Sequence, residues 1–311
     1  MSIQNGAAID AAGKLHELLV GYYINGEHMQ KHSDKSGQSP EEAHNTIKDR
    51  VSPEEYEQID NRARAAAAYI KLQFESQKNP IAVVSWTSKP GDIERVTGIK
   101  ASQHDDPSDI MFTHENATYT GISLKVSYKR NAKVPVSTIG IGTMDTNTGT
   151  NGVSNQTNAR IEIENTYPEL RTFTNKSQRK EFLKNNPAIK TSVDAIHKKH
   201  LNMAAREYAT VLGNMEPQEL SGFLRNHVLH ARETIIPHYR FTTGGLNGNY
   251  THNLVQPSTE YNEQFNSPEH FTVQHSGNGI IVKHKGKKFV RLQLKRDSTS
   301  DSKSAYKLIG R

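Results

Sequence analysis

The chain contains no cysteine, which excludes disulfide bonds, thiolate zinc sites and cysteine nucleophiles. No apolar run approaches the roughly 18 residues that a membrane-spanning helix needs, and the first residues lack the charged and apolar segments of a secretion signal. A glycine-rich Walker loop, a repeat of fixed period and a low-complexity tract are also absent from the sequence. These absences predict a cytoplasmic protein without thiol chemistry.

Hydrophobic residues are scarce. They make up 34% of the 311 residues and the mean hydropathy is −0.74, so we expect a very polar surface. The length still allows a substantial core, in one large domain or in two of ordinary size. A net charge of +6 and a pI of about 9.2 favour an acidic partner such as nucleic acid, without establishing one.

The most informative segment, residues 106–128, has two short apolar runs joined by a polar turn centred on Asn116. This pattern predicts a β-hairpin. Side chains alternate along a strand, so Ser123 and Lys125 are predicted to share one face. Antiparallel pairing about the turn then puts Asp109 opposite Ser123 and one diagonal step from Lys125. The three side chains are predicted to form a site suited to a cation beside a phosphate.

Each of these residues also has an ordinary explanation. An aspartate such as Asp109 often enters a strand or caps a turn. A lysine such as Lys125 often protects an edge strand against aggregation. The hydroxyl of Ser123 would form a hydrogen bond in the site rather than bind a metal strongly.

A further acid comes from a helix predicted at residues 8–28. The apolar residues of this helix recur at amphipathic spacing: Leu15, Leu18, Leu19 and Tyr22. Glu17 lies beside this apolar stripe rather than on the far side of the helix. It is either a second carboxylate of the site or an ordinary solvated residue.

The order of these features resembles the motifs of the PD-(D/E)XK nuclease superfamily. The likeness covers roughly residues 10–130: an acid on the first helix, then an aspartate and a lysine in the pattern D-x13-S-x-K. Ser123 stands where that family usually carries Glu or Asp. The resemblance implies an α/β fold with a restriction-endonuclease-like core, in which helices flank a mixed sheet. It also implies a metal-dependent endonuclease that hydrolyses the phosphodiester bonds of DNA.

The resemblance gives each residue a role. Asp109 and Glu17 would bind Mg²⁺, or Mn²⁺ in its place, together with the backbone carbonyl of Leu124. Mg²⁺ prefers hard oxygen ligands and is typically held by one or two carboxylates plus substrate phosphate. Lys125 would orient or help deprotonate the attacking water, or stabilise charge on the phosphate. With Ser123 in place of an acid, we expect one firm metal site.

Neighbouring acids could replace the missing carboxylate. Asp106 ranks ahead of Asp105, because adjacent positions on a strand face opposite ways. Glu115 lies in the predicted turn and is expected to be a solvated loop residue.

Cations are concentrated near the C-terminus. They form a predicted basic hairpin with interleaved apolar residues: Lys283, Lys285, Lys287, Lys288, Arg291, Lys295 and Arg296. This hairpin either contacts a nucleic-acid backbone or is a solvated edge hairpin that resists aggregation.

Other patterns place the remaining elements. They predict a helix at 53–78, strands at 81–86 and 134–141, a long loop at 144–158, helices over 175–233 and a small antiparallel sheet at 271–294. The predicted regions are a nuclease core at 1–165, a helical region at 166–235 and a basic β-rich region at 236–311. Two His-x-x-His pairs, at 197/200 and 227/230, lack a matched third ligand, which disfavours a zinc site.

The preferred interpretation is a Mg²⁺-dependent endodeoxyribonuclease, and a homodimer of it would allow both DNA strands to be cut. Two other classes stay open. One is a catalytically inactive nucleic-acid-binding protein with a nuclease-like fold, for which Ser123 is the best argument. The other is a structural or assembly protein whose basic hairpin contacts nucleic acid.

Overall fold

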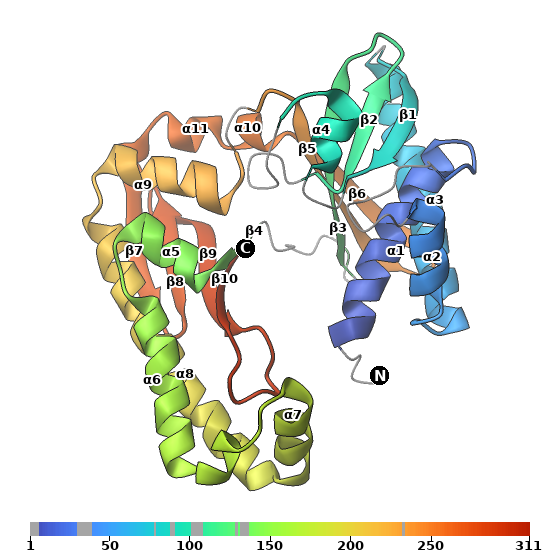
Figure 1. Ribbon diagram of the computed structural model, residues 1–311. Coiled ribbons are helices and arrows are strands. Elements are labelled where there is room, and N and C mark those ends of the chain that lie inside the picture. The colour runs from blue at the N-terminus through green and yellow to red at the C-terminus, as the bar shows by residue number, and fades with distance from the viewer. Residues whose placement is uncertain are drawn as a thin grey trace. The chain divides into compact units, whose positions relative to one another are not determined.

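A computed structural model describes residues 6–29, 39–77, 79–87, 91–100, 108–127, 130, 137–231 and 234–311. The chain forms two compact units, coloured along the sequence in Figure 1. Unit 1 combines Met1–Val134 with Ala231–Glu260, and unit 2 combines Pro135–His230 with Tyr261–Arg311. The region boundaries predicted after residues 165 and 235 do not coincide with these units.

Unit 1 is built on a mixed five-stranded sheet. Its strands, in spatial order, are β1 (Ile81–Trp86), β2 (Ile110–His114), β3 (Tyr119–Ser127), β5 (His238–Leu246) and β6 (Asn249–Val255). Strands β3 and β5 are parallel, and the other neighbours are antiparallel. The expected α/β class with a mixed sheet is thus confirmed. Residues 238–255 were assigned to the C-terminal region without predicted strands, and in the structure they form β5 and β6 and extend the sheet of the hairpin.

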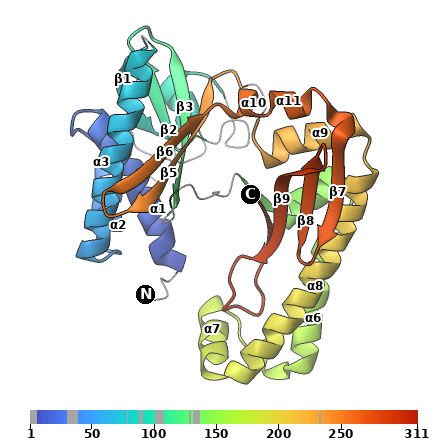
Figure 2. The same cartoon turned by 180° about the vertical axis from the view of Figure 1, so that it is seen from behind.

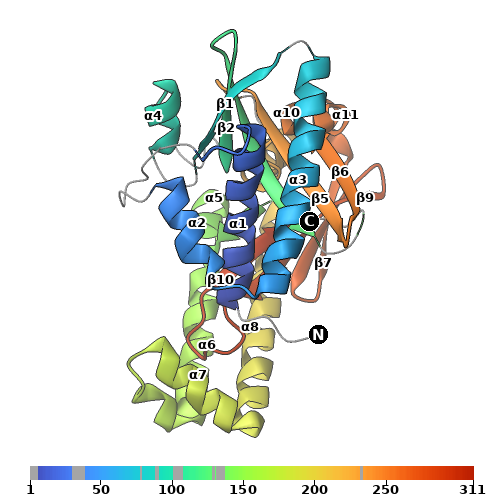
Figure 3. The ribbon, with the colours of Figure 1, turned by 90° about the vertical axis from the view of Figure 1, so that its right-hand side faces the viewer.

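Helices cover both faces of this sheet (Figure 3). Helices α1 (Gly6–Ile24) and α3 (Pro53–Ser76) pack on one face, with Leu15 and Phe74 in a common core with Ile122. Helix α4 (Asp92–Thr97) packs on the other face, where Ile93 joins Met111. The short helices α2 (Pro40–Lys48) and α10 (Pro257–Glu260) complete the unit.

Helix α2 falls in a segment whose polar composition suggests a linker. It begins with a capping box in which Ser39 and Glu42 satisfy each other's backbone N–H groups. Its buried residues Ala43 and Ile47 then join the core of α1 and α3. The cap and this apolar burial together support a helix that composition alone does not reveal.

Unit 2 contains an antiparallel sheet, seen in Figure 2. Its strands, in spatial order, are β4 (Ser137–Gly140), β10 (Tyr306–Gly310), β9 (Lys287–Arg296), β8 (Gly279–His284) and β7 (Phe271–Ser276). The antiparallel sheet predicted at 271–294 is confirmed. The basic hairpin is formed by β8 and β9, which lie inside the sheet, so its interpretation as an edge hairpin is wrong.

Most helices of unit 2 follow β4 in the chain and precede the other four strands of this sheet. They are α5 (Ile141–Thr148), α6 (Gly152–Thr166), α7 (Lys176–Asn185), α8 (Pro187–Asn214) and α9 (Pro217–Phe223), followed by a short π-helix at Leu224–Val228. The rest are α11 (Asn262–Phe265) and 3₁₀ turns at Pro168–Arg171 and Pro268–His270. Helix α8 packs against α6 and against strands β7, β8 and β9.

The loop predicted at residues 144–158 is wrong, because most of this segment is helical. Its Thr, Asn and Gly residues have weak helix propensity, but tertiary contacts override it. The carboxylate of Asp145 accepts hydrogen bonds from the N–H groups of Gly152 and Val153, both at 2.8 Å, and so caps α6. Tyr208 on α8 donates to the same carboxylate at 2.5 Å. A side chain at residue 152 would overlap the Tyr208 hydroxyl, so only glycine fits there.

Candidate functional site

The backbone holds Asp109 at the end of the first sheet, immediately before β2. Its N–H donates to the carbonyl of Ile122 on β3 at 2.9 Å, and its own carbonyl accepts from the N–H of Thr87 at 3.0 Å. The register of the hairpin pairs Ile110 with Ile122 and so continues to Asp109 opposite Ser123. This is the pairing that the turn position predicted.

The carboxylate of Asp109 gathers the other predicted residues of the hairpin. Its Oδ2 accepts from the backbone N–H of Leu124 at 2.6 Å and from the hydroxyl of Ser123 at 3.2 Å. The same oxygen lies 3.6 Å from Nζ of Lys125, and the side chains of Asp109 and Lys125 are 23% and 31% exposed. The cluster is therefore preorganised and still open to solvent.

Strand alternation also follows the prediction. Ile122 and Leu124 enter the core with α1, while Ser123 and Lys125 lie on the opposite face of β3. The N–H and carbonyl of one strand residue point to the same strand edge. Because the N–H of Leu124 points to Asp109, its carbonyl points to that edge as well. The carboxylate of Asp109, the hydroxyl of Ser123 and the carbonyl of Leu124 thus all come from the hairpin.

Glu17 lies on α1, on the core side of the sheet near Trp86 and Ile110. The indole N–H of Trp86 donates to its carboxyl at 3.3 Å, beside a narrow apolar pocket that Val84 and Ile110 help to line. Burial raises the pKa of Glu17 to about 8, and the negative charge of Asp109 adds to this rise. The positive charge of Lys125 opposes it. Residues 17, 109 and 125 therefore share one electrostatic environment.

The titration of Glu17 can be observed directly, because Trp86 is the only tryptophan of the chain. We expect tryptophan emission to change with a midpoint near pH 8 in the wild type, where the pKa of Glu17 lies. Glu17→Gln has no carboxyl to ionise and should lose this transition. Glu115→Gln removes a carboxyl from the exposed turn and is the control for loss of charge. The same transition in all three proteins would contradict the assignment.

The raised pKa also has a consequence for stability. Between its ordinary pKa of 4.5 and about 8, the folded chain keeps a proton on Glu17 that the unfolded chain has released. The free energy of unfolding therefore falls as the pH rises through this range. Glu17→Gln should flatten this decline in thermal unfolding measured from pH 5 to pH 9.

The donors available at the site are two carboxylates and one backbone carbonyl. Over the described ranges, no three His, Asp or Glu side chains cluster closely enough to hold a metal by themselves. Asp105 and Asp106, the predicted substitutes for the missing acid, lie outside the described residues. Glu115 is exposed in the hairpin turn, as predicted.

Sequence reasoning missed two neighbours on β5. Arg240 pairs with Ser123 and Thr242 pairs with Lys125 in the parallel register, so both lie on the face of the site. Arg240 also forms an ion pair with Glu260 at 2.5 Å. No local pattern indicates these partners, because β3 and β5 are far apart in the sequence. Trp86 was detectable only as the last residue of a predicted strand.

The first His-x-x-His pair makes separate contacts within unit 2. The ring of His197 bonds to the Tyr306 hydroxyl at 2.8 Å and to the Ser302 carbonyl at 2.9 Å. The ring of His200 lies 2.8 Å from the carboxylate of Glu162 on α6. These histidines join α8 to its neighbours.

No protein-family model, curated protein or solved structure matches this chain. In the part of the chain that is described, every helix is too short or too polar to cross a membrane. Support for a function therefore comes from the residues of the site itself.

Proposed function

We propose that this chain is a metal-dependent endonuclease that hydrolyses phosphodiester bonds of DNA, with a restriction-endonuclease-like core in unit 1. One observation carries the proposal. The carboxylate of Asp109 lies 3.6 Å from the ammonium group of Lys125 at the end of a mixed sheet, and its negative charge acts on the half-buried carboxyl of Glu17. Acidic oxygens that can hold a metal, with a cation beside them, can activate a water and stabilise the charge that develops in phosphodiester hydrolysis.

The donor set fits a hard divalent cation. Glu17, Asp109 and the carbonyl of Leu124 would hold Mg²⁺ or Mn²⁺, which commonly takes one or two carboxylates and completes its shell with water and phosphate. When bound, the cation would polarise the phosphate and favour an ionised water. Burial and the negative charge of Asp109 raise the pKa of Glu17, and a bound cation would lower it again by adding positive charge at the site.

The protein groups have distinct tasks in this proposal. The hydrogen bonds from Ser123 and from the N–H of Leu124 fix the rotamer of Asp109. Lys125 orients the attacking water or neutralises charge on the phosphate oxygens. Ser123 positions its neighbour and supplies no charge, so one firm metal site is proposed rather than two.

The competing proposal is an inactive nucleic-acid-binding protein with the same fold. Ser123 favours it, because an acid at that position would give the site a third carboxylate. A structural or assembly protein that binds nucleic acid through unit 2 is a further alternative, favoured by the basic strands β8 and β9.

A plasmid assay separates these proposals. We expect the purified chain to convert supercoiled plasmid to nicked or linear DNA with Mg²⁺ or Mn²⁺, and not with EDTA. Lys125→Ala should lose this activity, while Lys71→Ala, which removes an exposed lysine from α3, should keep it. Retention of DNA without cutting by the wild type would contradict the endonuclease and support the inactive binder.

A further inference from the structure

The sheet of unit 2 has two chemically different faces. Apolar residues on one face are almost fully buried on the side of α8, among them Ile280, Val290 and Leu292. The alternate residues point the other way. The cations of this other face are Lys283, Lys288, Arg291, Lys295, Lys307 and Arg311, and we call them the cationic face. Their strands add neutral residues there, such as Gln274 and Gln293.

Within the cationic face, like charges stand directly opposite each other. Lys283 pairs with Lys288 across β8 and β9, and Lys295 pairs with Lys307 across β9 and β10. Arg291 and Arg311 exchange two backbone hydrogen bonds, at 2.8 and 2.9 Å. Like charges directly opposite on antiparallel strands destabilise a sheet. An anion bound at this face would offset the repulsion within the three pairs.

Acidic residues of unit 2 do little to neutralise this face. Within the described ranges, Lys307 forms the one ion pair found there, with Asp297 at 2.8 Å. Some cations elsewhere in the unit have acidic partners, as in Arg179 with Asp301 and Lys199 with Glu162. The cationic face differs because its cations have like-charged residues directly opposite on the neighbouring strand.

The crowding is strong enough to affect titration. The pKa of Lys295 is lowered, first by partial burial and then by the positive charges of Arg311, Lys307 and Arg291. A bound anion would reverse the electrostatic part of this shift. Lys295 is thus influenced by three other cations of this face.

We propose that the cationic face binds the phosphate backbone of duplex DNA. The choice of DNA as the anion rests on the endonuclease function proposed above, and the face would add a contact outside the site of Asp109. From Lys288 to Lys295, β9 extends by roughly 23 Å at about 3.3 Å per residue. At about 3.4 Å per base pair, this length matches about seven base pairs. Gln274 and Gln293 can donate further hydrogen bonds to phosphate oxygens.

The sheet suits this partner physically. Backbone hydrogen bonds already hold its cations at strand spacing, so binding should cost little backbone conformational entropy. A row of phosphates presents charge at regular intervals along a stiff rod. Such contacts attach DNA without reading its sequence.

Salt dependence of binding tests the proposal. The variant Lys283→Gln/Arg291→Gln/Lys295→Gln removes three charges from the cationic face. The matched control, Lys180→Gln/Lys184→Gln/Lys198→Gln, removes three exposed charges from α7 and α8. Binding of a labelled 20-base-pair duplex is followed by fluorescence anisotropy in EDTA between 50 and 300 mM NaCl. EDTA keeps the DNA uncut during the measurement.

We expect the face variant to bind about 10- to 100-fold more weakly at 100 mM salt. The slope of log K against log salt should fall in magnitude by about 0.9 for each phosphate that is no longer neutralised. The control variant should keep the wild-type slope. The thermal unfolding temperature of the face variant should be no lower than that of the wild type, because the variant relieves like-charge repulsion. If the triple variant does not fold, each single variant should lower the slope by about 0.9.

Equal slopes for the face variant and the wild type would overturn the proposal. So would charge-dependent binding to phosphatidylserine vesicles or to polyglutamate in the absence of DNA binding. Failure of the endonuclease proposal is a separate result: the plasmid stays uncut while the face variant still loses DNA binding. Cutting by the wild type together with unchanged binding by the face variant would remove only the cationic-face proposal.

Discussion

Asp109→Asn is expected to slow plasmid cleavage by about 100- to 1,000-fold, the range seen when one preorganised electrostatic group is removed from an active site. Asparagine keeps the size of the side chain and an oxygen that can accept from Ser123 and from the N–H of Leu124. It removes the negative charge that faces Lys125 and the cation. The measurement is the initial rate of loss of supercoiled plasmid at saturating Mg²⁺.

A matched control for this variant is Ser123→Ala. Asp109 then loses one hydrogen bond but keeps its charge and the bond from Leu124, so we expect a decrease of less than about 10-fold. The free energy of unfolding shows whether slower cleavage is due to loss of folding. The pair between Asp109 and Lys125 is partly exposed and contributes about 0–1 kcal/mol, so Asp109→Asn should remain folded. Wild-type cleavage by Asp109→Asn would rule out the proposed role of this carboxylate.

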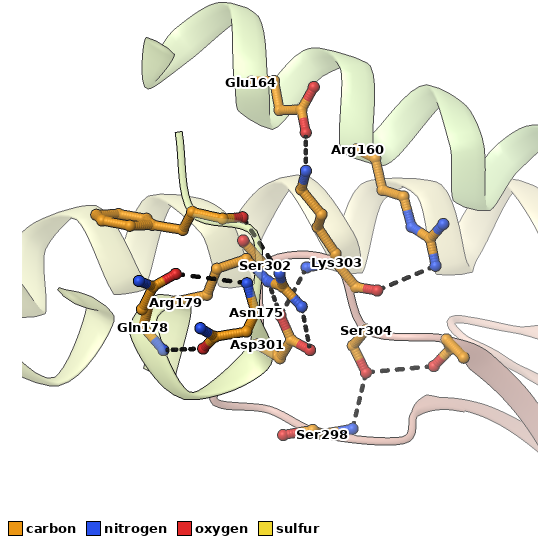
Figure 4. Close-up of polar contacts among 12 residues, drawn as sticks. Arg160, Glu164, Asn175, Gln178, Arg179, Ser298, Asp301, Ser302, Lys303 and Ser304 are labelled. Atoms are coloured by element: carbon orange, nitrogen blue, oxygen red, sulfur yellow. Dashed lines mark hydrogen bonds and ion pairs between the residues drawn. The ribbon is translucent and has the colours of Figure 1, made fainter. Parts of the chain in front are cut away.

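Asp301→Ala is expected to destabilise unit 2 by about 3–5 kcal/mol, the usual effect of breaking one half of a buried ion pair. Figure 4 shows the cluster in which Asp301 lies, between β9 and β10. Arg179 on α7 donates to its two oxygens at 2.7 and 3.4 Å, and the backbone N–H of Lys303 donates at 3.1 Å. Alanine would leave the guanidinium of Arg179 buried without its counter-charge.

Urea unfolding of unit 2 measures this effect, and two further variants interpret it. Arg179→Met/Asp301→Leu replaces both charges with apolar groups of similar volume, which should recover most of the lost stability. Asp297→Ala breaks the more exposed pair with Lys307 and should cost no more than about 1 kcal/mol. Similar losses for Asp301→Ala and Asp297→Ala would contradict a special role for the buried pair.

The same pair sets a pH dependence. Burial alone would raise the pKa of Asp301, but the hydrogen bonds from Arg179 and from the N–H of Lys303 outweigh it and lower the pKa below 3.8. The stability that this carboxylate contributes is therefore present at neutral pH and is lost as the pH falls through its folded pKa. The gap between Asp301→Ala and the wild type should accordingly shrink in strong acid.

The hairpin of the candidate site was predictable because its geometry is local. Once the turn is centred on Asn116, strand periodicity alone fixes Asp109 opposite Ser123 and places Lys125 on the same face. Helical periodicity likewise placed Glu17 beside the apolar stripe of α1. These inferences need only a few neighbouring residues, so the sequence contains all the information they require.

The remaining features depend on residues that are distant in the sequence. Arg240 reaches the site through the pairing of β3 with β5, which no local pattern encodes. Helix α6 forms where Thr and Asn favour a loop, because Asp145 accepts from its first N–H groups and Tyr208 holds that carboxylate in place. The place of β5 and β6 in the first sheet depends on the same distant pairing, and no local pattern indicates it.

The parallel pairing of β3 with β5 has a consequence for biosynthesis. A ribosome completes the strand that carries Lys125 about 110 residues before it makes the neighbouring strand, and most of the intervening segment belongs to unit 2. Until then, the edge of β3 that later pairs with β5 exposes unpaired backbone N–H and carbonyl groups, which can pair with another chain and lead to aggregation. Nascent chains that stop before residue 238 should therefore need a chaperone, and the first sheet should close only after the inserted segment has been synthesised.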